Sequence, residues 1–171
     1  DTPGYFDFSG QVKSALKVVD TSVSFVKSFE GIEVGTESTW EFVKEAGIPS
    51  AFIINKCDNE HSKFFDTFKS IKERLSVNAV IVSFPVNEGL NFNTIIDLIK
   101  MKAVTYDAAG TKKLSESEIP ADKKAVADKL REELIEKAAE ASEDLMNNFF
   151  ENATLSEEEL KEGIKLGITS K

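Results

Sequence analysis

The run Ala51-Phe52-Ile53-Ile54, followed directly by Asn55-Lys56-Cys57-Asp58, decides the fold of this chain. Four consecutive apolar residues are typical of a strand that is buried inside a parallel sheet. The polar tetrapeptide then marks the carboxyl end of that strand, and this is the edge where open α/β sheets bind their ligands. We therefore expect an α/β fold with a partial doubly wound sheet, in which residues 55–58 form a binding turn.

The N-K-x-D pattern of this turn has a chemical meaning. The Asp58 carboxylate can accept two hydrogen bonds from guanine, one from N1–H and one from the 2-amino group. Adenine has no such pair of donors and would leave the carboxylate desolvated and unpaired, so such a site discriminates strongly between the two bases. Asn55 can donate to the O6/N7 edge of the purine, and the stem of Lys56 can lie along the ring face. The turn thus predicts binding of a guanine nucleotide.

The first four residues, Asp1-Thr2-Pro3-Gly4, form a D-x-x-G pattern. At the end of a strand, the Asp1 carboxylate could hold a water of a Mg²⁺ shell, and the Gly4 amide could approach a γ-phosphate where a Cβ would obstruct it. The same residues also suit an ordinary type I or type II turn. The 54 positions from Asp1 to Asn55 (55 − 1) favour the phosphate interpretation, because a doubly wound sheet needs about that much chain to align two such turns.

Composition and charge narrow the classes of function. With 41% hydrophobic and 30% charged residues, 171 residues make one ordinary domain or two small ones. We see no apolar stretch of membrane-spanning length and no signal peptide, and a single cysteine agrees with a reducing, cytoplasmic setting. Cys57 and His61 suggest no metal cluster, and we expect His61 to be a solvated surface residue. The net charge of −9 argues against a nucleic-acid-binding face.

The hydrophobic periodicity predicts alternating helices and strands before residue 77. We expect a helix over 10–19, a strand over 22–26, a helix capped by Thr36 and stopped at Gly47, a buried strand over 51–54, and a helix over 60–74.

Beyond residue 77 the predicted pattern changes to shorter strands and a long helix. We expect strands over 80–85, 93–98 and 101–106, of which the last two form a hairpin, and a loop over 110–117. A long helix should follow Pro120, with one face formed by Val126, Leu130, Leu134 and Ala138. A capping box should open the last helix, either Thr154-x-x-Glu157 or Ser156-x-x-Glu159. Residues 1–76 carry 12 acids and 9 bases (−3), and residues 77–171 carry 18 and 12 (−6). The excess of acidic residues over 77–171 indicates either a solvated helix face or a docking surface for a basic partner.

Several segments together resemble the GTPase domain of bacterial elongation factor G, the factor that drives translocation on the ribosome. Residues 1–8 resemble its switch II segment. Residues 30–40 and the Asn55-Lys56-Cys57-Asp58 turn follow in the same order and spacing, and residues 95–103 resemble a hairpin of the subdomain that this family inserts. The resemblance covers essentially all 171 residues. It implies that residues 1–76 are the C-terminal part of a P-loop-GTPase-type domain and that residues 77–171 are the small α+β inserted subdomain.

The resemblance also implies roles for individual residues. Asp1 would support Mg²⁺ through a water, and the Gly4 amide would meet the γ-phosphate of GTP. Asn55 and Asp58 would recognise guanine in GTP or GDP, with Lys56 packed on the base and ribose. Such factors act on the ribosome in the cytoplasm, and a ribosomal stalk protein docks on the inserted subdomain, here residues 77–171. Neither a membrane nor a specific nucleic-acid sequence is an expected partner.

Two departures from the family pattern qualify these expectations. The residue after D-T-P-G is Tyr5, where the factor has a His that orients the attacking water. A phenol can hydrogen-bond a water but does not titrate in the range of an imidazole, so we expect slower or differently triggered hydrolysis. Tyr at this position resembles a paralogous branch of elongation-factor-G-like proteins. The second departure is that no G-x-x-x-x-G-K-[ST] phosphate loop occurs in the sequence.

Without a phosphate loop, we expect a fragment of a larger protein that has no GTPase activity and binds little or no nucleotide by itself. The exposed edges of its parallel strands would favour self-association. An alternative function is that of a non-catalytic interaction module for the ribosomal stalk protein. A third interpretation, an unrelated doubly wound domain that binds another phosphate ligand, is disfavoured by the missing Gly-rich loop.

Overall fold

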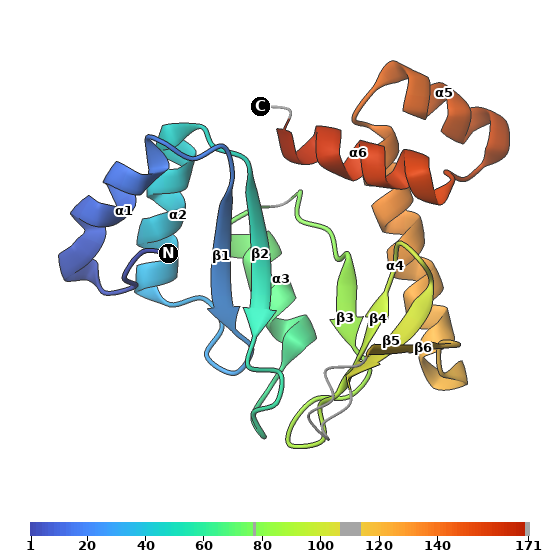
Figure 1. Ribbon diagram of the computed structural model, residues 1–171, viewed down its shortest axis with the longest axis horizontal. Helices are drawn as coiled ribbons and strands as arrows, with labels where there is room; N and C mark the ends of the chain where they lie inside the picture. Colours follow the sequence, from blue (N-terminus) through green and yellow to red (C-terminus); the bar gives the residue numbers. More distant parts are fainter. Residues whose placement is uncertain (77, 107–113, 170–171) are drawn as a thin grey trace. The chain divides into compact units, whose positions relative to one another are not determined.

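The computed structural model describes residues 1–76, 78–106 and 114–169 (Figure 1). They form two compact units that divide between Ala79 and Val80. The first unit contains a parallel sheet with helices, and the second contains an antiparallel sheet and three helices. The α/β fold class is therefore confirmed.

The first unit is built around two parallel strands. Its elements are η1 (Phe6–Phe8), α1 (Ser9–Leu16), β1 (Ser22–Lys27), α2 (Val34–Ala46), β2 (Ser50–Asn55) and α3 (Phe64–Arg74). The two strands are paired along their whole length, from Ser22 opposite Ser50 to Lys27 opposite Asn55. Their carboxyl ends therefore lie side by side at one edge of the sheet (Figure 1).

One face of this sheet carries the core of the unit. Val26 of β1 packs with Ile32 and Ile71, and Phe52 and Ile54 of β2 join the same cluster. The indole of Trp40 lies 5.1 Å from the Phe52 ring, and its N–H donates to the Leu75 carbonyl at 2.9 Å. A second cluster joins α1 to α2 through residues that share a buried helix face. These are Val12, Leu16 and Val43.

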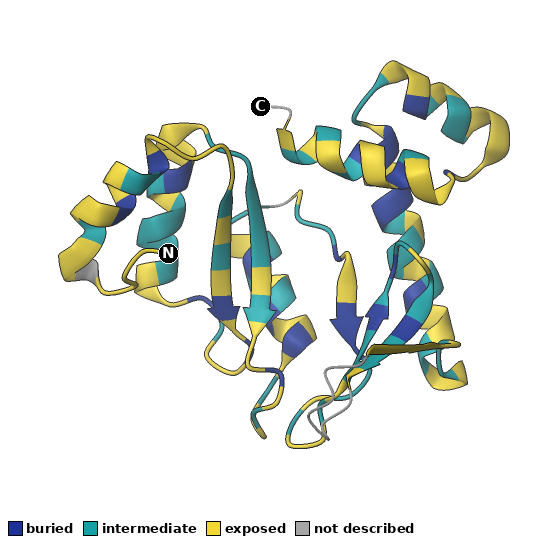
Figure 2. Ribbon diagram, in the orientation of Figure 1, coloured by how far each residue is buried: buried dark blue, intermediate teal, exposed yellow. Residues whose placement is uncertain are grey.

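The opposite face of the sheet is exposed. The side chains of Val23, Phe25 and Ile53 are 51%, 64% and 43% exposed, and Figure 2 shows exposed and partly buried positions alternating along β1 and β2. The expectation of a buried strand over 51–54 is therefore wrong, because the core cluster that includes β2 residues packs on only one face of the sheet. An apolar run does not distinguish burial on one face from burial on both.

The helix boundaries differ from the predicted ones by up to four residues. Helix α2 begins at Val34 with Glu33 as its N-cap, so Thr36 lies inside the first turn and is not the cap. Gly47 ends this helix in the left-handed conformation, with φ of 63°, as the sequence predicts. Helix α3 begins at Phe64 and not at residue 60, since residues 60–63 still belong to the turn that follows β2.

The second unit contains a four-stranded antiparallel sheet in the order β3-β4-β5-β6, followed by helices. Its elements are β3 (Ser83–Pro85), β4 (Thr94–Asp97), β5 (Lys102–Tyr106), β6 (Leu114–Ser117), α4 (Ala121–Ala139), α5 (Glu143–Asn152) and α6 (Glu157–Thr169). The predicted hairpin is confirmed as β4 and β5, which pair from Thr94 opposite Thr105 to Asp97 opposite Lys102. Within the described residues, no helix is both long and apolar enough to cross a bilayer.

Three elements of this unit differ from the sequence-based expectation. Strand β3 covers only Ser83–Pro85 of the strand predicted over 80–85. The predicted loop over 110–117 is wrong at residues 114–117, which form β6 beside β5, while residues 110–113 lie outside the described residues. Helix α5 is not among the elements that the sequence predicts. Its N-cap is Ser142, whose hydroxyl accepts from the Leu145 amide at 3.2 Å.

The long helix α4 is confirmed, but its buried face is shifted. Leu134 and Ala138 are buried as expected, whereas Val126 is 41% exposed and Ala127 is buried in its place. Of the two candidate capping boxes, the structure forms the one between Ser156 and Glu159.

Candidate functional site

The predicted binding turn lies at the carboxyl edge of the parallel sheet. Asn55 is the last residue of β2 and is paired with Lys27, the last residue of β1. Ser28 directly follows Lys27, and its amide donates to the Asn55 carbonyl at 2.9 Å. This bond extends the hydrogen bonding between the two strands by one residue. The segment after Asn55 thus leaves the sheet at the edge where ligands bind in α/β folds.

The N-K-x-D turn has a defined backbone conformation. Lys56 is in the left-handed region with φ of 64°, which is uncommon for a residue with a Cβ. Its amide donates to the Asn55 Oδ1 at 2.8 Å, and its carbonyl accepts from the Asn59 amide at 3.0 Å. The Cys57 Sγ is directed inward and donates to the Ile54 carbonyl at 3.6 Å.

This conformation separates the four residues of the motif into two groups. Cys57 is buried, whereas Asn55, Lys56 and Asp58 are exposed. The three residues predicted to contact guanine are therefore accessible on one short turn, and the residue without a predicted role anchors that turn. This arrangement fits a planar base with hydrogen-bonding groups along one edge.

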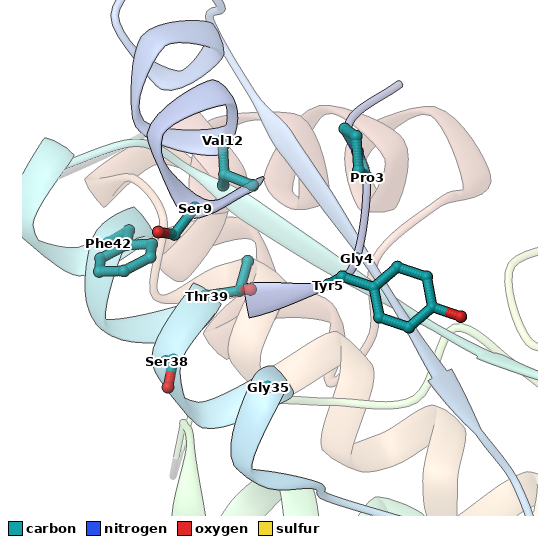
Figure 3. Close-up of a pocket in the computed structure, with 9 residues that line it drawn as sticks. All are labelled: Pro3, Gly4, Tyr5, Ser9, Val12, Gly35, Ser38, Thr39 and Phe42. Atoms are coloured by element: carbon teal, nitrogen blue, oxygen red, sulfur yellow. The ribbon is translucent and has the colours of Figure 1, made fainter. Parts of the chain in front are cut away.

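The D-x-x-G segment lies against the start of α2. Residues 3–5 line a shallow pocket whose other wall includes Gly35, Ser38 and Thr39 of that helix (Figure 3). A Cβ built on Gly35 would lie 4.0 Å from the Gly4 carbonyl oxygen, so the two backbones are close. In Figure 3 the Tyr5 ring points away from this pocket, and its side chain is 79% exposed.

A cluster of charged side chains lies at the end of β1, where Lys27 pairs with Glu30 and Glu33. The hydrogen bond from Lys27 to Glu30 is the main cause that raises the pKa of Lys27 above its usual 10.5. The charges of Glu30, Glu33 and Tyr5 act in the same direction, while partial desolvation opposes them. The Lys27 Nζ is 3.8 Å from a Glu33 carboxylate oxygen. The positive charge at the end of β1 is therefore paired with carboxylates that follow it in the chain.

The predicted metal site depends on a single carboxylate. Among the described residues, no group of three or more His, Cys, Asp and Glu side chains could hold a metal. Asp1 is exposed and remains the one carboxylate that the sequence predicts for Mg²⁺, through a water. The proposed binding roles stay predictions for all five residues of the two motifs, which are Asp1, Gly4, Asn55, Lys56 and Asp58.

Two residues that the motifs do not include lie directly behind the turn. Ser28 and Thr67 are buried, at 1% and 3% exposure, and both carry hydroxyls that hydrogen-bond to backbone carbonyls. The only sequence signal for Ser28 is a small hydroxyl residue directly after an apolar strand. That signal is common, so it does not distinguish Ser28 from other residues that follow a strand.

Known proteins are similar to this chain in sequence and in fold. The family described as "Elongation factor Tu GTP binding domain" matches residues 1–166. A crystal structure of a Thermus thermophilus protein superposes on 99% of this chain with a TM-score of 0.86 and 25% sequence identity. The chain spans only 25% of the length of that protein. Because the family match extends over nearly all of the sequence, the chain belongs to the elongation factor Tu GTP-binding domain family of translational GTPases.

Proposed function

We propose that this chain supplies the guanine-recognition part of the nucleotide site in a longer GTPase of the elongation factor G type. Such a protein would hydrolyse GTP on the ribosome, in the cytoplasm, to drive translocation in protein synthesis. The observation that supports this proposal is the N-K-x-D turn at the carboxyl end of β2, with Asn55, Lys56 and Asp58 exposed and Cys57 buried. The resemblance of residues 1–8 to switch II supports the same assignment.

The turn would bind the base by complementary hydrogen bonds. The Asp58 carboxylate would accept from N1–H and from the 2-amino group of guanine, and the Asn55 amide would donate to the opposite edge. The Lys56 stem would cover one face of the ring. Contacts to the phosphates need residues outside this chain, because its sequence contains no G-x-x-x-x-G-K-[ST] loop. Asp1 and Gly4 would supply only the Mg²⁺-bound water and one amide.

An exchange of the base tests the role of Asp58. Xanthine carries a carbonyl at C2 where guanine carries the amino group. An Asn side chain can accept from N1–H of xanthine and donate to this carbonyl, whereas it can accept only one of the two hydrogen bonds that guanine donates to a carboxylate. In the longer protein that carries this chain, Asp58→Asn should weaken GDP binding by about a hundredfold and strengthen binding of xanthosine diphosphate. Nucleotide affinity is measured by titration with fluorescent analogues.

Asp66→Asn is the matched control, since Asp66 is an exposed carboxylate in the first turn of α3. It should leave both affinities unchanged. If Asp58→Asn weakened GDP binding without any gain for xanthosine diphosphate, Asp58 would not recognise the base and the proposal would fail. Calorimetry of the 171-residue chain by itself should detect no GDP binding, and a micromolar affinity would contradict the expected division of the site.

The acidic second unit favours a second candidate function, docking of the ribosomal stalk protein. Glu132 and Glu136 of α4 and Glu140, the C-cap residue of this helix, are exposed and follow one another at four-residue spacing, so they share one helix face. Such a row of carboxylates suits a basic partner helix. Binding of purified stalk protein to this chain should weaken severalfold in the double variant Glu132→Lys/Glu136→Lys.

The control for this experiment is Glu41→Lys/Glu45→Lys, a pair with the same spacing on the exposed side of α2. It makes the same change in net charge in the first unit. Equal loss of binding in both double variants would indicate a general effect of charge and would argue against a docking site on α4.

A further inference from the structure

Ser28 is hydrogen-bonded to the first two peptide groups of the N-K-x-D turn. Its hydroxyl donates to the Lys56 carbonyl at 2.9 Å, and its amide donates to the Asn55 carbonyl at 2.9 Å. Both bonds run from the end of β1 to the segment that leaves β2. The side chain is 1% exposed, so water cannot easily replace the hydroxyl at the Lys56 carbonyl.

The carbonyl of Ser28 is bonded to the segment on the far side of the turn. It accepts from the Lys63 amide at 2.9 Å and from the Thr67 hydroxyl at 3.0 Å. Lys63 is the N-cap residue of α3, and Thr67 lies in the first turns of that helix. Ser28 therefore connects the beginning of the turn to the helix at its end.

The Lys56 carbonyl is the part of this network that bears on recognition. It receives two donors, the Ser28 hydroxyl and the Asn59 amide at 3.0 Å. Together they fix the peptide plane that follows Lys56, whose φ of 64° is uncommon for a residue with a side chain. This peptide group joins Lys56 to Cys57, and Asp58 is the next residue. The orientation of the peptide plane therefore determines the direction of the Asp58 carboxylate.

We propose that Ser28 is a positioning residue for guanine recognition: its buried hydroxyl holds the Lys56 carbonyl and so places the Asp58 carboxylate. The inference rests on the proposed function of the turn. Ser28 acts through Lys56 and does not touch the base, because its own side chain is buried behind the turn. Guanine selectivity is therefore shared between the motif and a residue 28 positions earlier in the chain.

The order of the turn can be measured in this chain without a nucleotide. Cys57 is the only cysteine in the sequence and is buried within the turn, so its reaction with an aromatic disulfide reagent reports how often the turn opens. The component of the Cys57 reaction rate that does not change with urea concentration reports local opening of the turn. The component that rises with urea reports global unfolding. Ser28→Ala should raise the urea-independent rate about fivefold, the effect of losing one buried hydrogen bond.

Thr67→Val is the matched control. It removes another buried hydroxyl that bonds to the same residue, but it leaves the bond between Ser28 and Lys56 intact. It should lower global stability and leave the urea-independent rate of Cys57 within twofold of the parent chain. Equal acceleration in both variants, or none in Ser28→Ala, would overturn the inference that the Ser28 hydroxyl holds this turn.

A second measurement, in the longer protein, connects the turn to recognition. Inosine diphosphate lacks the 2-amino group and can give the Asp58 carboxylate only one hydrogen bond. The ratio of inosine diphosphate to GDP dissociation constants therefore reports how well the carboxylate is placed. Ser28→Ala should reduce this ratio severalfold, and Thr67→Val should not.

The two measurements separate the inference from the proposed function. If the unmodified protein did not prefer GDP, the proposed function would be wrong, and the Cys57 rates would still decide whether Ser28 holds the turn. If it preferred GDP and Ser28→Ala kept the full preference, the positioning role would be overturned while the proposed function stood.

Discussion

Gly163 of α6 packs directly on Ala138 of α4, and a Cβ built on the glycine would come within 2.6 Å of the Ala138 carbonyl oxygen and 2.9 Å of its Cβ. Both contacts are too short for real atoms, and the first is to backbone, which cannot move aside as a flexible side chain would. The absence of a side chain at residue 163 therefore permits the close packing of these two helices.

Gly163→Ala should destabilise the second unit, because either helix must shift to make room for the methyl group. We expect a loss of about 2 kcal/mol in the free energy of unfolding, the usual cost of overpacking a tight contact. Urea denaturation followed by far-ultraviolet circular dichroism measures this loss. Gly167→Ala is the control in the same helix, since a Cβ there meets nothing within 4 Å. It should stabilise by about 0.5–1 kcal/mol through helix propensity, and equal losses in both variants would refute the packing argument.

The capping box of α6 gives a prediction for pH. The Ser156 hydroxyl and amide donate to a Glu159 carboxylate oxygen at 2.7 Å and 2.8 Å, and these bonds are the main causes that lower the pKa of Glu159 below its usual 4.5. A lowered pKa in the folded state means that this stabilisation is complete above pH 4.5 and is lost as the pH falls through the lower folded value.

Ser156→Ala removes a hydroxyl that caps α6, a change that typically costs about 1 kcal/mol, and it should flatten the acid dependence of stability below pH 4.5. Thermal unfolding at a series of pH values measures both effects. Thr154→Ala is the control, because Thr154 is exposed and belongs to the alternative box that the structure does not form. An unchanged acid slope in Ser156→Ala would show that Glu159 does not depend on this cap.

The exposed face of the parallel sheet leads us to expect self-association of the 171-residue chain. Parallel sheets are normally covered on both faces, yet Val23, Phe25 and Ile53 are exposed on one face of this one. Sedimentation at micromolar concentration should detect dimers or larger species, and Phe25→Glu should abolish them. Val18→Glu is the control, since Val18 is 83% exposed but lies outside the sheet. A parent chain that sediments as a monomer would contradict the expectation.

The parts of the fold that the sequence predicts correctly depend on local signals. The apolar run of β2 and the polar turn after it are adjacent in the chain, so their composition alone locates the strand and the motif. The same holds for Gly47, whose left-handed conformation ends α2. Strand β6 lacks such a signal, because all four of its residues, Leu114 to Ser117, are exposed and it is defined only by pairing with β5.

In the candidate site too, some features have a local sequence signal and others depend on tertiary contacts. The spacing of Asn55, Lys56 and Asp58 identifies them in the sequence. They are exposed because β2 ends at Asn55 and the turn begins there. The role of Ser28 depends on a hydrogen bond to a residue 28 positions away, which no local pattern encodes. The contact between the D-x-x-G segment and the first turns of α2 also requires tertiary packing, since the two are separated by α1 and β1.

Tyr5 allows a test of how hydrolysis would be triggered in the longer protein. Tyr5 lies within the segment that resembles switch II, and its side chain is 79% exposed, so the phenol is accessible to solvent. An imidazole titrates near neutral pH and a phenol does not, so Tyr5→His should raise ribosome-stimulated GTP turnover by about tenfold or more. Tyr5→Phe separates the hydroxyl from the ring: it should lower turnover further if the phenol orients the water. Turnover that is the same for Tyr, His and Phe at this position would show that residue 5 takes no part in hydrolysis.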